Sequence, residues 1–463
     1  MNLLSRESAL VDGAAPLGIR GRVRRVRGMG LRASDLPAPV GSLVRIGAQG
    51  DTLGEVVGFD DDETIVMLLS QTTGIIPGAP IVLERIRQSA PTGDWLLGRV
   101  VDGLGRPIDD LGAGRDPEER PLDAAPVGAM RRTRITEPLR TGVRVIDLMT
   151  PVGRGQRLGI FAGPGVGKST LLGQIARGTD ADVNVIALIG ERGREVREFI
   201  DQALGAEGLA RSVVVVSTGD ESPLMRIRAS KLACAAAEHF RDRGRDVMLM
   251  MDSITRFAHA QRQIGLSVGE PPATKGYTPS VFSAMPELLE RAGTIDAAEG
   301  ASGSITGLYT ILVEGDDMTE PVSDAARGIL DGHVMLSRDI AHRGQFPAVD
   351  VLDSVSRVAS HVADEGHMTA RQQIVRLVAA YREVEDLVQI GAYAHGTDPE
   401  TDTAIEMHPV INELLAQRAD EEADFAKARD MLVKLALQSG EMVQQRRQIA
   451  QSQSGHQQRQ SAQ

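Results

Sequence analysis

The stretch that decides the expected fold is FAGPGVGKST, residues 161–170. It follows the aliphatic run RLGIFAG, which is typical of a buried strand, and it opens a segment with helical character over Ser169–Arg177. A strand that leads through glycines into a helix is the context that a phosphate-binding P-loop requires. The helix N-terminus offers backbone N–H groups to an anion, and Lys168 adds a positive charge for β- and γ-phosphates. The hydroxyl of Ser169 is placed to ligate Mg²⁺.

The motif departs from the strict P-loop pattern at two positions. Ala162 stands where the pattern has its first glycine, a small change that such a loop can take. Pro164 has no backbone N–H and a fixed φ, so the donors to phosphate are expected from Gly165 onward. The predicted nucleotide-binding residues of this stretch are Ala162, Gly163, Pro164, Gly165, Val166, Gly167, Lys168, Ser169 and Thr170.

Two further predicted strands end in carboxylates. DVMLMMD ends in Asp252, and VNVIALIG is followed directly by Glu191. The carboxyl ends of parallel strands meet at one edge of a sheet, where ligands gather in α/β folds. We expect Asp252 to help hold Mg²⁺, and Glu191 to orient and partly deprotonate the water that attacks the γ-phosphate.

The wider pattern predicts three folded parts. From about residue 90 to 360 near-continuous aliphatic runs alternate with helical segments, which indicates a doubly wound α/β core with a mainly parallel sheet. Before it, short strands punctuated by Gly, Pro and Asp indicate a small antiparallel β-barrel. After about residue 365 the pattern is helical. The expected divisions are an N-terminal arm (1–18) with a short helix around Leu3–Val11, the barrel (19–88), the nucleotide-binding α/β domain (89–364), a helical domain (365–440) and a polar tail (441–463) that frays or is disordered.

Composition narrows the class of protein. The chain has 463 residues, a formal net charge of -12 and only 3% aromatic residues, which argues against broad nucleic-acid binding. The single cysteine, Cys234, cannot form an intrachain disulfide and leaves no cysteine-based metal site. The N-terminus has too short an apolar run for a signal peptide, and no stretch approaches the length of a membrane span. We therefore expect a cytosolic protein.

The run FPAVDVLDSVSR, residues 346–357, suits a short strand and a turn that end in Arg357. Most arginines in such positions face solvent. A charge in this position could also meet a phosphate held elsewhere, because an arginine that stabilises phosphoryl transfer can be supplied by another subunit.

Several stretches together carry a resemblance that extends from about residue 19 to 435. They are GRGQRLGIFAGPGVGKST, LIGERGREVREFI, DSITRFAHAQRQIG, GEPPATKGYTPSVFSAMPELLERAG and FPAVDVLDSVSR. In this order they resemble the hexameric rotary ATPase family. More narrowly, they resemble the ATPases of type III protein export, which comprise the flagellum-specific ATPase and its injectisome relatives.

The resemblance implies roles for residues that bind ATP and Mg²⁺ within one subunit. Lys168 and Ser169 match the P-loop lysine and the Mg²⁺-binding hydroxyl. Glu191 matches the glutamate that activates water, Arg192 beside it matches a γ-phosphate contact, and Asp252 matches the Mg²⁺-associated aspartate.

It implies three more positions that complete the site. Arg256 matches an arginine that senses the γ-phosphate, and Phe346 falls where the family places an aromatic ring against adenine. Arg357 matches the arginine finger, which reaches the nucleotide of the neighbouring subunit. A finger supplied in trans requires a closed head-to-tail ring, so the resemblance implies a homohexamer.

The resemblance also implies partners and a location. These are a coiled-coil central stalk protein, a stalk-like regulator dimer bound by residues 1–18, export substrates with their chaperones, and a membrane export gate. The chain would be cytoplasmic and peripheral to the inner-membrane export apparatus. It would use ATP hydrolysis to release or unfold export substrates.

Three alternatives remain open at this level. The run DAARGILDGHVMLSRDIAHRGQFPAVDVL favours the flagellar members over the injectisome ATPases on resemblance alone. A rotary ATP synthase subunit is less favoured, because GEPPATKGYTPSVFSAMPELLERAG looks like the export type and one chain carries both Glu191 and Arg357. An RNA-translocating hexameric helicase shares the core and a barrel, but the acidic charge and scarce aromatics oppose it.

Overall fold

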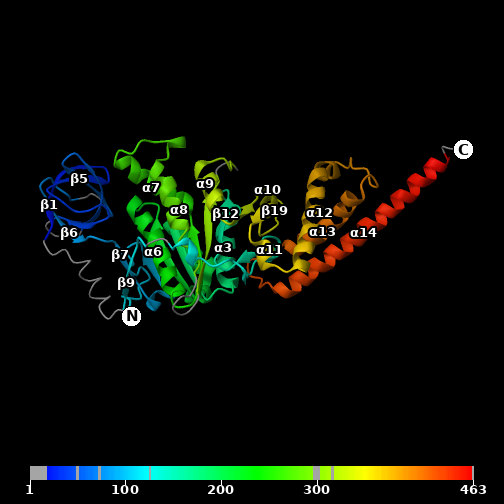
Figure 1. Ribbon diagram of the computed structural model, residues 1–463, viewed down its shortest axis with the longest axis horizontal. Coiled ribbons are helices and arrows are strands. Elements are labelled where there is room, and N and C mark those ends of the chain that lie inside the picture. The colour runs from blue at the N-terminus through cyan, green and yellow to red at the C-terminus, as the bar shows by residue number, and fades with distance from the viewer. Residues whose placement is uncertain are drawn as a thin grey trace.

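A computed structural model describes residues 18–47, 52–70, 74–124, 127–295, 303–313 and 317–460, with the backbone alone for Ala129 and residues 452–460. The described chain is elongated, with a β-barrel at one end, a mixed sheet in the middle and helices at the other end (Figure 1). The arm predicted over residues 1–18, with its helix over Leu3–Val11, lies outside the described residues apart from Gly18. Among the described residues, no helix combines the length and the apolar character needed to span a membrane.

The barrel is closed and antiparallel. Around it the strands of the described residues pair in the order β1 (Arg20–Arg27), β2 (Gly30–Ser34), β5 (Glu63–Leu68), β4 (Thr52–Asp60), β3 (Leu43–Ile46) and β6 (Pro80–Arg85). The alternation along β1 shows how the sequence builds it, because Val23 is buried in the barrel whereas Arg22 and Arg24 are exposed. The small antiparallel barrel predicted from the sequence is confirmed.

The central sheet is parallel except at its β19 edge and at the short β16. The strands along it are β19 (Val349–Ser356), β18 (Gly332–Leu336), β12 (Arg157–Ala162), β17 (Ser304–Leu312), β15 (Asp246–Asp252), β13 (Val183–Glu191), β14 (Ser212–Thr218) and β8 (Val100–Asp102), with β16 (Gly293–Thr294) antiparallel to β17. The strands of this sheet that were expected as near-continuous aliphatic runs are buried along almost their whole length. The carboxyl ends of β12, β13 and β15 therefore lie at the same edge of the sheet.

Helices cover both faces of the sheet, which confirms the doubly wound core. On one face lie α2 (Arg144–Met149), α3 (Lys168–Gly178), α4 (Gly193–Glu198), the π-helical turn η3 (Phe199–Leu204) and α5 (Gly205–Ala210). On the other lie α6 (Pro223–Arg241), α7 (Ile254–Ser267), α8 (Pro279–Leu289) and α9 (Pro321–Ile329). Neighbouring residues of β12 serve both cores: Ile160 packs on the first face and Phe161 on the second.

Short elements join these layers. They are the pairs β7 (Ser89–Thr92) with β9 (Glu118–Pro121) and β10 (Pro138–Leu139) with β11 (Val152–Gly153), the 3₁₀ turns η1 (Asp94–Leu96), η2 (Ala129–Arg131) and η4 (Thr274–Gly276), and the helices α10 (Arg338–His342) and α11 (Ala359–Val362).

The C-terminal region is helical, as expected. It consists of α12 (Glu365–Gln389), α13 (Pro399–Leu415) and α14 (Phe425–Gln460), which pack against one another. Asp364 and Asp398 cap the first two of these helices by accepting hydrogen bonds from the backbone N–H groups of His367 and Thr401, at 3.0 and 2.8 Å.

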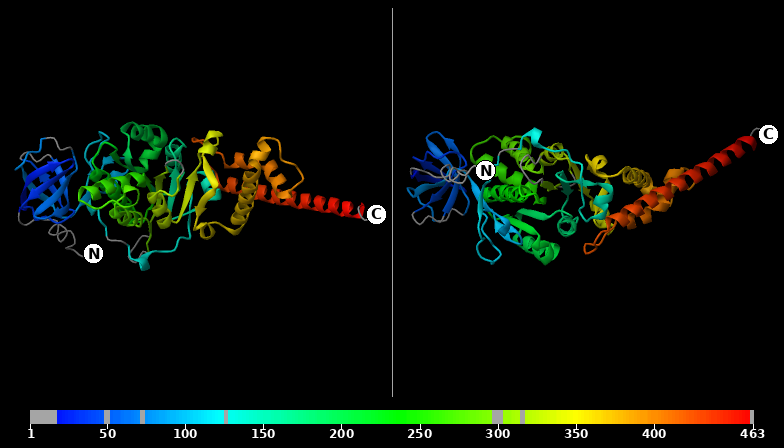
Figure 2. Two further views of the ribbon diagram at one scale, coloured as in Figure 1. Left: turned by 90° about the horizontal axis from the view of Figure 1, so that it is seen from above. Right: turned by 60° about the horizontal axis from the view of Figure 1, so that its bottom comes forward.

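The structure differs from the sequence prediction over the polar tail. The tail expected over 441–463 is helical as far as Gln460, because α14 continues and projects away from the rest of the chain (Figure 2). Arg446 is paired with Glu406 of α13, and Arg447 lies 3.7 Å from Glu400. These contacts and a sequence rich in Gln, with three Arg, which are good helix formers, explain why the polar composition does not end the helix.

Candidate nucleotide-binding site

The loop between β12 and α3 has the geometry of a phosphate cradle. Gly165 and Gly167 have φ values of 79° and 90°, a left-handed conformation that glycine adopts without steric cost. Val166 between them is buried and fixes the loop to the core. Lys168 begins α3, so the first turn of an 11-residue helix presents its unpaired N–H groups at the mouth of the loop.

Lys168 meets both strand-end carboxylates that the sequence singled out. Its ammonium group donates a hydrogen bond to Asp252 and lies 3.7 Å from Oε1 of Glu191. Asp252 is buried and also accepts a hydrogen bond from the hydroxyl of Thr310, at 2.7 Å. The register of β13 and β15, which pairs Leu188 with Asp252, brings these groups together. The expected convergence of three strand ends is present in the structure.

Burial changes the acidity of Glu191. Its loss of hydration and the negative charge of Asp252 raise its pKa to about 7, although the nearby Lys168 opposes the shift. A carboxyl group with a pKa close to neutrality is suited to accept a proton from water.

This raised pKa predicts the pH dependence of turnover. If Glu191 acts as a base it must be ionised, so we expect the ATPase rate at limiting ATP to rise as pH increases from about 6 to 8, with its midpoint close to 7. Steady-state rates across this range would measure the profile. The Glu191→Gln chain should lack the rise, and an unchanged profile in that variant would contradict the assignment.

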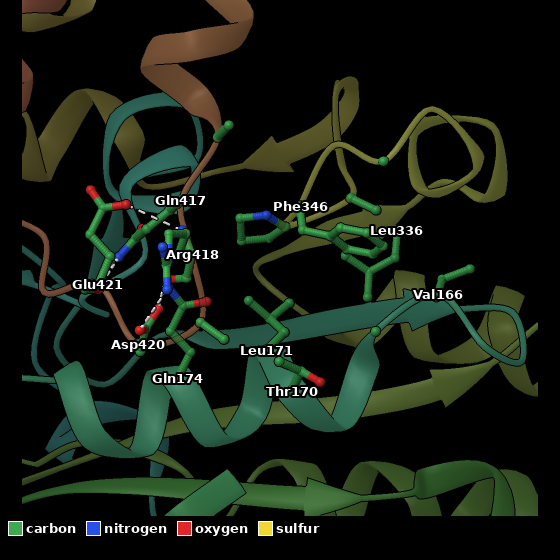
Figure 3. Close-up of a pocket in the computed structure, with 16 residues that line it drawn as sticks. Val166, Thr170, Leu171, Gln174, Leu336, Phe346, Gln417, Arg418, Asp420 and Glu421 are labelled. Atoms are coloured by element: carbon green, nitrogen blue, oxygen red, sulfur yellow. Dashed lines mark hydrogen bonds and ion pairs between the residues drawn. The ribbon is translucent and has the colours of Figure 1, made fainter.

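A cavity of about 750 Å³ opens beside the phosphate loop. Phe346 and Leu336 lie on one side of it and Gln417 and Arg418 on the other, while α3 runs below, with Leu171 between the two sides and Gln174 under Arg418 (Figure 3). A methyl group placed on Gly167 would lie 3.6 Å from the ring of Phe346. The half-exposed ring thus stands next to the loop with a face available for a planar base.

The far wall of this cavity was not predicted from the sequence. It is the loop 416–421 between α13 and α14, which is held by Gln417: its side chain accepts a hydrogen bond from N–H of Arg144 at 2.7 Å and donates one to the carbonyl of Gly142 at 3.0 Å. The N–H of Gln417 also donates to the carbonyl of Phe346, at 2.9 Å. No local pattern marks this loop, because its place beside the site depends on contacts between residues far apart in the chain.

Of the two predicted arginines, Arg256 packs at the end of β13 and Arg192 faces solvent. The side-chain carbons of Arg256 pack against Gly190 at the end of β13, and its Nε atom is buried without a hydrogen-bond partner among the described residues. Arg192 is not drawn into the cluster: its side chain is 87% exposed and lies 3.8 Å from Glu195.

Arg357 lies at the opposite edge of the sheet from the phosphate loop of its own chain. β19 runs antiparallel to β18, with Leu336 paired with Val349 and Gly332 paired with Ser356. The run therefore begins beside the loop, at Phe346, and ends roughly 15 Å further along the sheet. There Arg357 is exposed and donates a hydrogen bond to the carbonyl of Arg327 at 3.3 Å. The strand direction separates Phe346 and Arg357, which are only 11 residues apart.

The fold and the site together define the class of protein to which this chain belongs. A parallel sheet whose strand β12 leads through a glycine loop into a helix, with a lysine and two strand-end carboxylates at that point, is a P-loop nucleoside triphosphatase core. The barrel before it and the helices after it place the core within a three-part chain.

Comparisons with known proteins identify the family. Family models match residues 142–356 (ATP synthase alpha/beta family, nucleotide-binding domain), 35–83 (ATP synthase alpha/beta family, beta-barrel domain) and 363–434 (T3SS EscN ATPase C-terminal domain). The flagellum-specific ATP synthase of Pseudomonas aeruginosa is 48% identical over 422 residues, which cover 90% of this chain and 93% of that protein. The type 3 secretion system ATPase of Xanthomonas euvesicatoria is 47% identical over 415 residues, 89% of this chain and 93% of that protein.

A solved structure agrees. The assembled ATPase EscN from the type III secretion system of enteropathogenic E. coli superposes with a TM-score of 0.85 at 41% identity, over 90% of this chain and all of that one. The chain therefore belongs to the type III export ATPases of the rotary ATPase family, and it is a P-loop ATPase. The family resemblance expected from the sequence is confirmed.

Proposed function

We propose that this chain hydrolyses ATP to energise flagellar type III protein export, by releasing or unfolding export substrates and their chaperones at a membrane export gate. The observation that supports ATP hydrolysis is the contact of Lys168 with both Asp252 and Glu191. The flagellar system is favoured because flagellum-specific relatives from Pseudomonas aeruginosa, Treponema pallidum and Bacillus subtilis are each 48% identical. An injectisome ATPase is the alternative, since relatives of that kind also reach 48%, over 80% of this chain, whereas the three flagellar relatives match 87–95% of it.

Deleting the gene tests the flagellar assignment. We expect loss of swimming motility and of secreted flagellar filament protein, with both restored by the wild-type gene and not by a Glu191→Gln gene. Motility assays and blots of culture supernatants would measure this. A motile deletion strain that has lost secretion of injected effectors would support the injectisome alternative instead.

The site supports a direct hydrolytic mechanism. The N–H groups of Gly165 to Thr170 and the ammonium group of Lys168 would bind the β- and γ-phosphates, and Phe346 would pack against the adenine. Glu191 would accept a proton from water as the water oxygen attacks the γ-phosphorus, and the bond to the β-phosphate oxygen would break to give ADP and phosphate. Arg192 and Arg256 would contact the γ-phosphate, although Arg192 must first turn inward from its exposed position.

The donors present also fit Mg²⁺. Ser169 is exposed on the first turn of α3, and Asp252 offers a carboxylate at the end of β15, which β17 separates from β12 in the sheet. Within the described ranges no three His, Cys, Asp or Glu side chains cluster as a metal site, which suits an ion that is held mainly by phosphate oxygens and water. Such an ion would neutralise charge that develops on the phosphates. Ser169 and Asp252 would hold it in place.

The position of Arg357 supports action in a homohexamer. Since it lies at the opposite sheet edge from its own phosphate loop, its guanidinium would complete the site of the next subunit in a head-to-tail ring. The likeness to EscN, which was solved as an assembly, supports the same arrangement.

The remaining partners are proposed on family grounds. EscN was also solved in complex with its central stalk EscO, at a TM-score of 0.83 to this chain, so we propose a coiled-coil stalk protein in the centre of the ring. A stalk-like regulator dimer would bind residues 1–18. The chain would act in the cytoplasm at the inner-membrane export apparatus and would bind no nucleic acid, consistent with its net charge of -12.

A further inference from the structure

The segment 337–346, which joins β18 to β19 and contains α10, touches the phosphate loop near both of its ends. Leu336 pairs with Ala162 in the sheet, so the segment leaves the sheet beside the first residue of the loop. It returns at Phe346, whose ring stands against Gly167. We call residues 337–346 the α10 segment.

The first of these contacts is made by Arg338. A methyl group placed on Gly163 would lie 2.8 Å from Nη2 of Arg338 and 3.3 Å from its Nε, so the guanidinium occupies the space of a side chain. Gly163 is not among the residues with positive φ, so its backbone does not itself require glycine. A side chain at this position would therefore have to displace the guanidinium of Arg338. Arg338 is the first residue of α10, which Ser337 caps by accepting a hydrogen bond from N–H of Ile340 at 3.4 Å.

The contact between Arg338 and Gly163 lies next to Pro164, the residue of the loop that has no backbone N–H. Pro164 has no N–H, so the loop lacks one of the donors with which a phosphate loop surrounds its anion. A guanidinium against Gly163 brings a permanent positive charge and a rigid planar group to this half of the loop.

We propose that Arg338 is a positioning residue of the phosphate loop, whose guanidinium packs against Gly163 and holds the half of the loop that contains Pro164. The proposal rests on the proposed assignment of residues 162–170 as the phosphate site. Arg338 supports the phosphate chain of the nucleotide and not its base, which would lie at the Phe346 end of the cavity.

The first test separates these two ends of the ligand. Mg²⁺ with ADP and adenosine alone are titrated into the full-length chain and its Arg338→Ala variant, by calorimetry for ADP and saturation-transfer NMR for adenosine. We expect ADP affinity to fall about tenfold, because the half of the loop that contains Pro164 loses its support, while adenosine affinity is unchanged. Arg338→Lys should recover part of the loss, since it keeps the charge without the planar group. Unchanged ADP affinity, or equal losses for both ligands, would overturn the proposal.

The second test disturbs the same contact by changing the loop residue, with a methyl group added at Gly163. Gly163→Ala should displace the guanidinium and weaken ADP as Arg338→Ala does, and the double variant should be no weaker than either single variant. Independent losses that multiply would refute the contact. If Arg338→Ala does not fold, as judged by its thermal midpoint without nucleotide, Gly163→Ala and Arg338→Lys carry the test.

Arg343→Ala is the matched control. Arg343 lies on the same segment, is half exposed and pairs with Glu385 of α12, away from the loop, so the ADP affinity of the variant should stay within about twofold of wild type.

The Lys168→Ala variant distinguishes failure of the phosphate-loop assignment from failure of the role proposed for Arg338. If that variant keeps its ADP affinity, the phosphate-loop assignment fails, whereas loss there without loss in Arg338→Ala refutes only the role of Arg338.

Discussion

Replacing Lys168 by alanine is expected to weaken the binding of Mg²⁺ with ATP at least about a hundredfold and to remove measurable turnover. The ammonium group contacts Asp252 and lies 3.7 Å from Glu191, within a site where the lysine side chain is only 13% exposed. Removing it costs the contact to the phosphates and also leaves two carboxylates facing a polyanion. Loss of one member of a buried charge pair costs about 2–5 kcal/mol, which is consistent with this factor. Calorimetry with the full-length chain would measure it.

Lys427→Ala provides the comparison. Lys427 lies on α14, is 82% exposed, pairs with Asp424 at 3.1 Å and does not line the cavity, so the same change in charge occurs outside the site. Its ATP affinity and thermal midpoint should match the wild type. Near-normal ATP affinity in the Lys168→Ala chain would remove the basis for treating residues 162–170 as the phosphate site.

The residues of the site that could be predicted from the sequence are those at the ends of individual predicted strands. Each aliphatic run forms a buried strand, and a residue at the end of the run lies at the carboxyl edge, so the order of residues predicts that Glu191 and Asp252 lie at the same edge of the sheet as Lys168. The same logic predicted the barrel, whose strands alternate between buried and exposed side chains.

What could not be predicted depends on how distant segments meet. The loop 416–421 reaches the cavity only because Gln417 is bonded to Gly142 and Phe346, and nothing in its own sequence shows this. The raised pKa of Glu191 arises from burial and from Asp252, which are properties of the folded site. The continuation of α14 through a polar tail depends in part on its ion pairs with α13.

The direction in which β19 pairs with β18 decides which of its ends lies at the chain's own nucleotide site, and this direction could not be predicted from the sequence. The alternating pattern of FPAVDVLDSVSR is the same whether the strand runs parallel or antiparallel to β18, so the pattern alone could not show which of its two ends lies beside the phosphate loop. Since the strand is antiparallel, Phe346 stands at the chain's own site and Arg357 does not. The structure thus supports, from strand geometry, the action in trans that the family resemblance implied.

Mixing two inactive variants is expected to restore ATPase activity. Arg357→Ala should lower turnover about 10³-fold or more, because an arginine finger contributes about 10³–10⁵ to the rate. Glu191→Gln should bind ATP and hydrolyse it very slowly, because the amide cannot accept a proton from water. In a mixed ring, an Arg357→Ala subunit still has Glu191 and can receive Arg357 from a Glu191→Gln neighbour. With equal amounts and random order, roughly one quarter of the interfaces would be intact.

The controls for this experiment follow from the same geometry. A chain carrying both Glu191→Gln and Arg357→Ala should rescue neither single variant: mixed with Arg357→Ala it supplies no arginine, and mixed with Glu191→Gln it supplies no glutamate. Native mass spectrometry would show that mixed rings form, and steady-state phosphate release would measure their activity. If Arg357 acted within its own chain, no combination of the two variants could recover activity, because every subunit would still carry its own defect. Rescue therefore distinguishes a finger that crosses between subunits from an arginine that only holds β19 to Arg327.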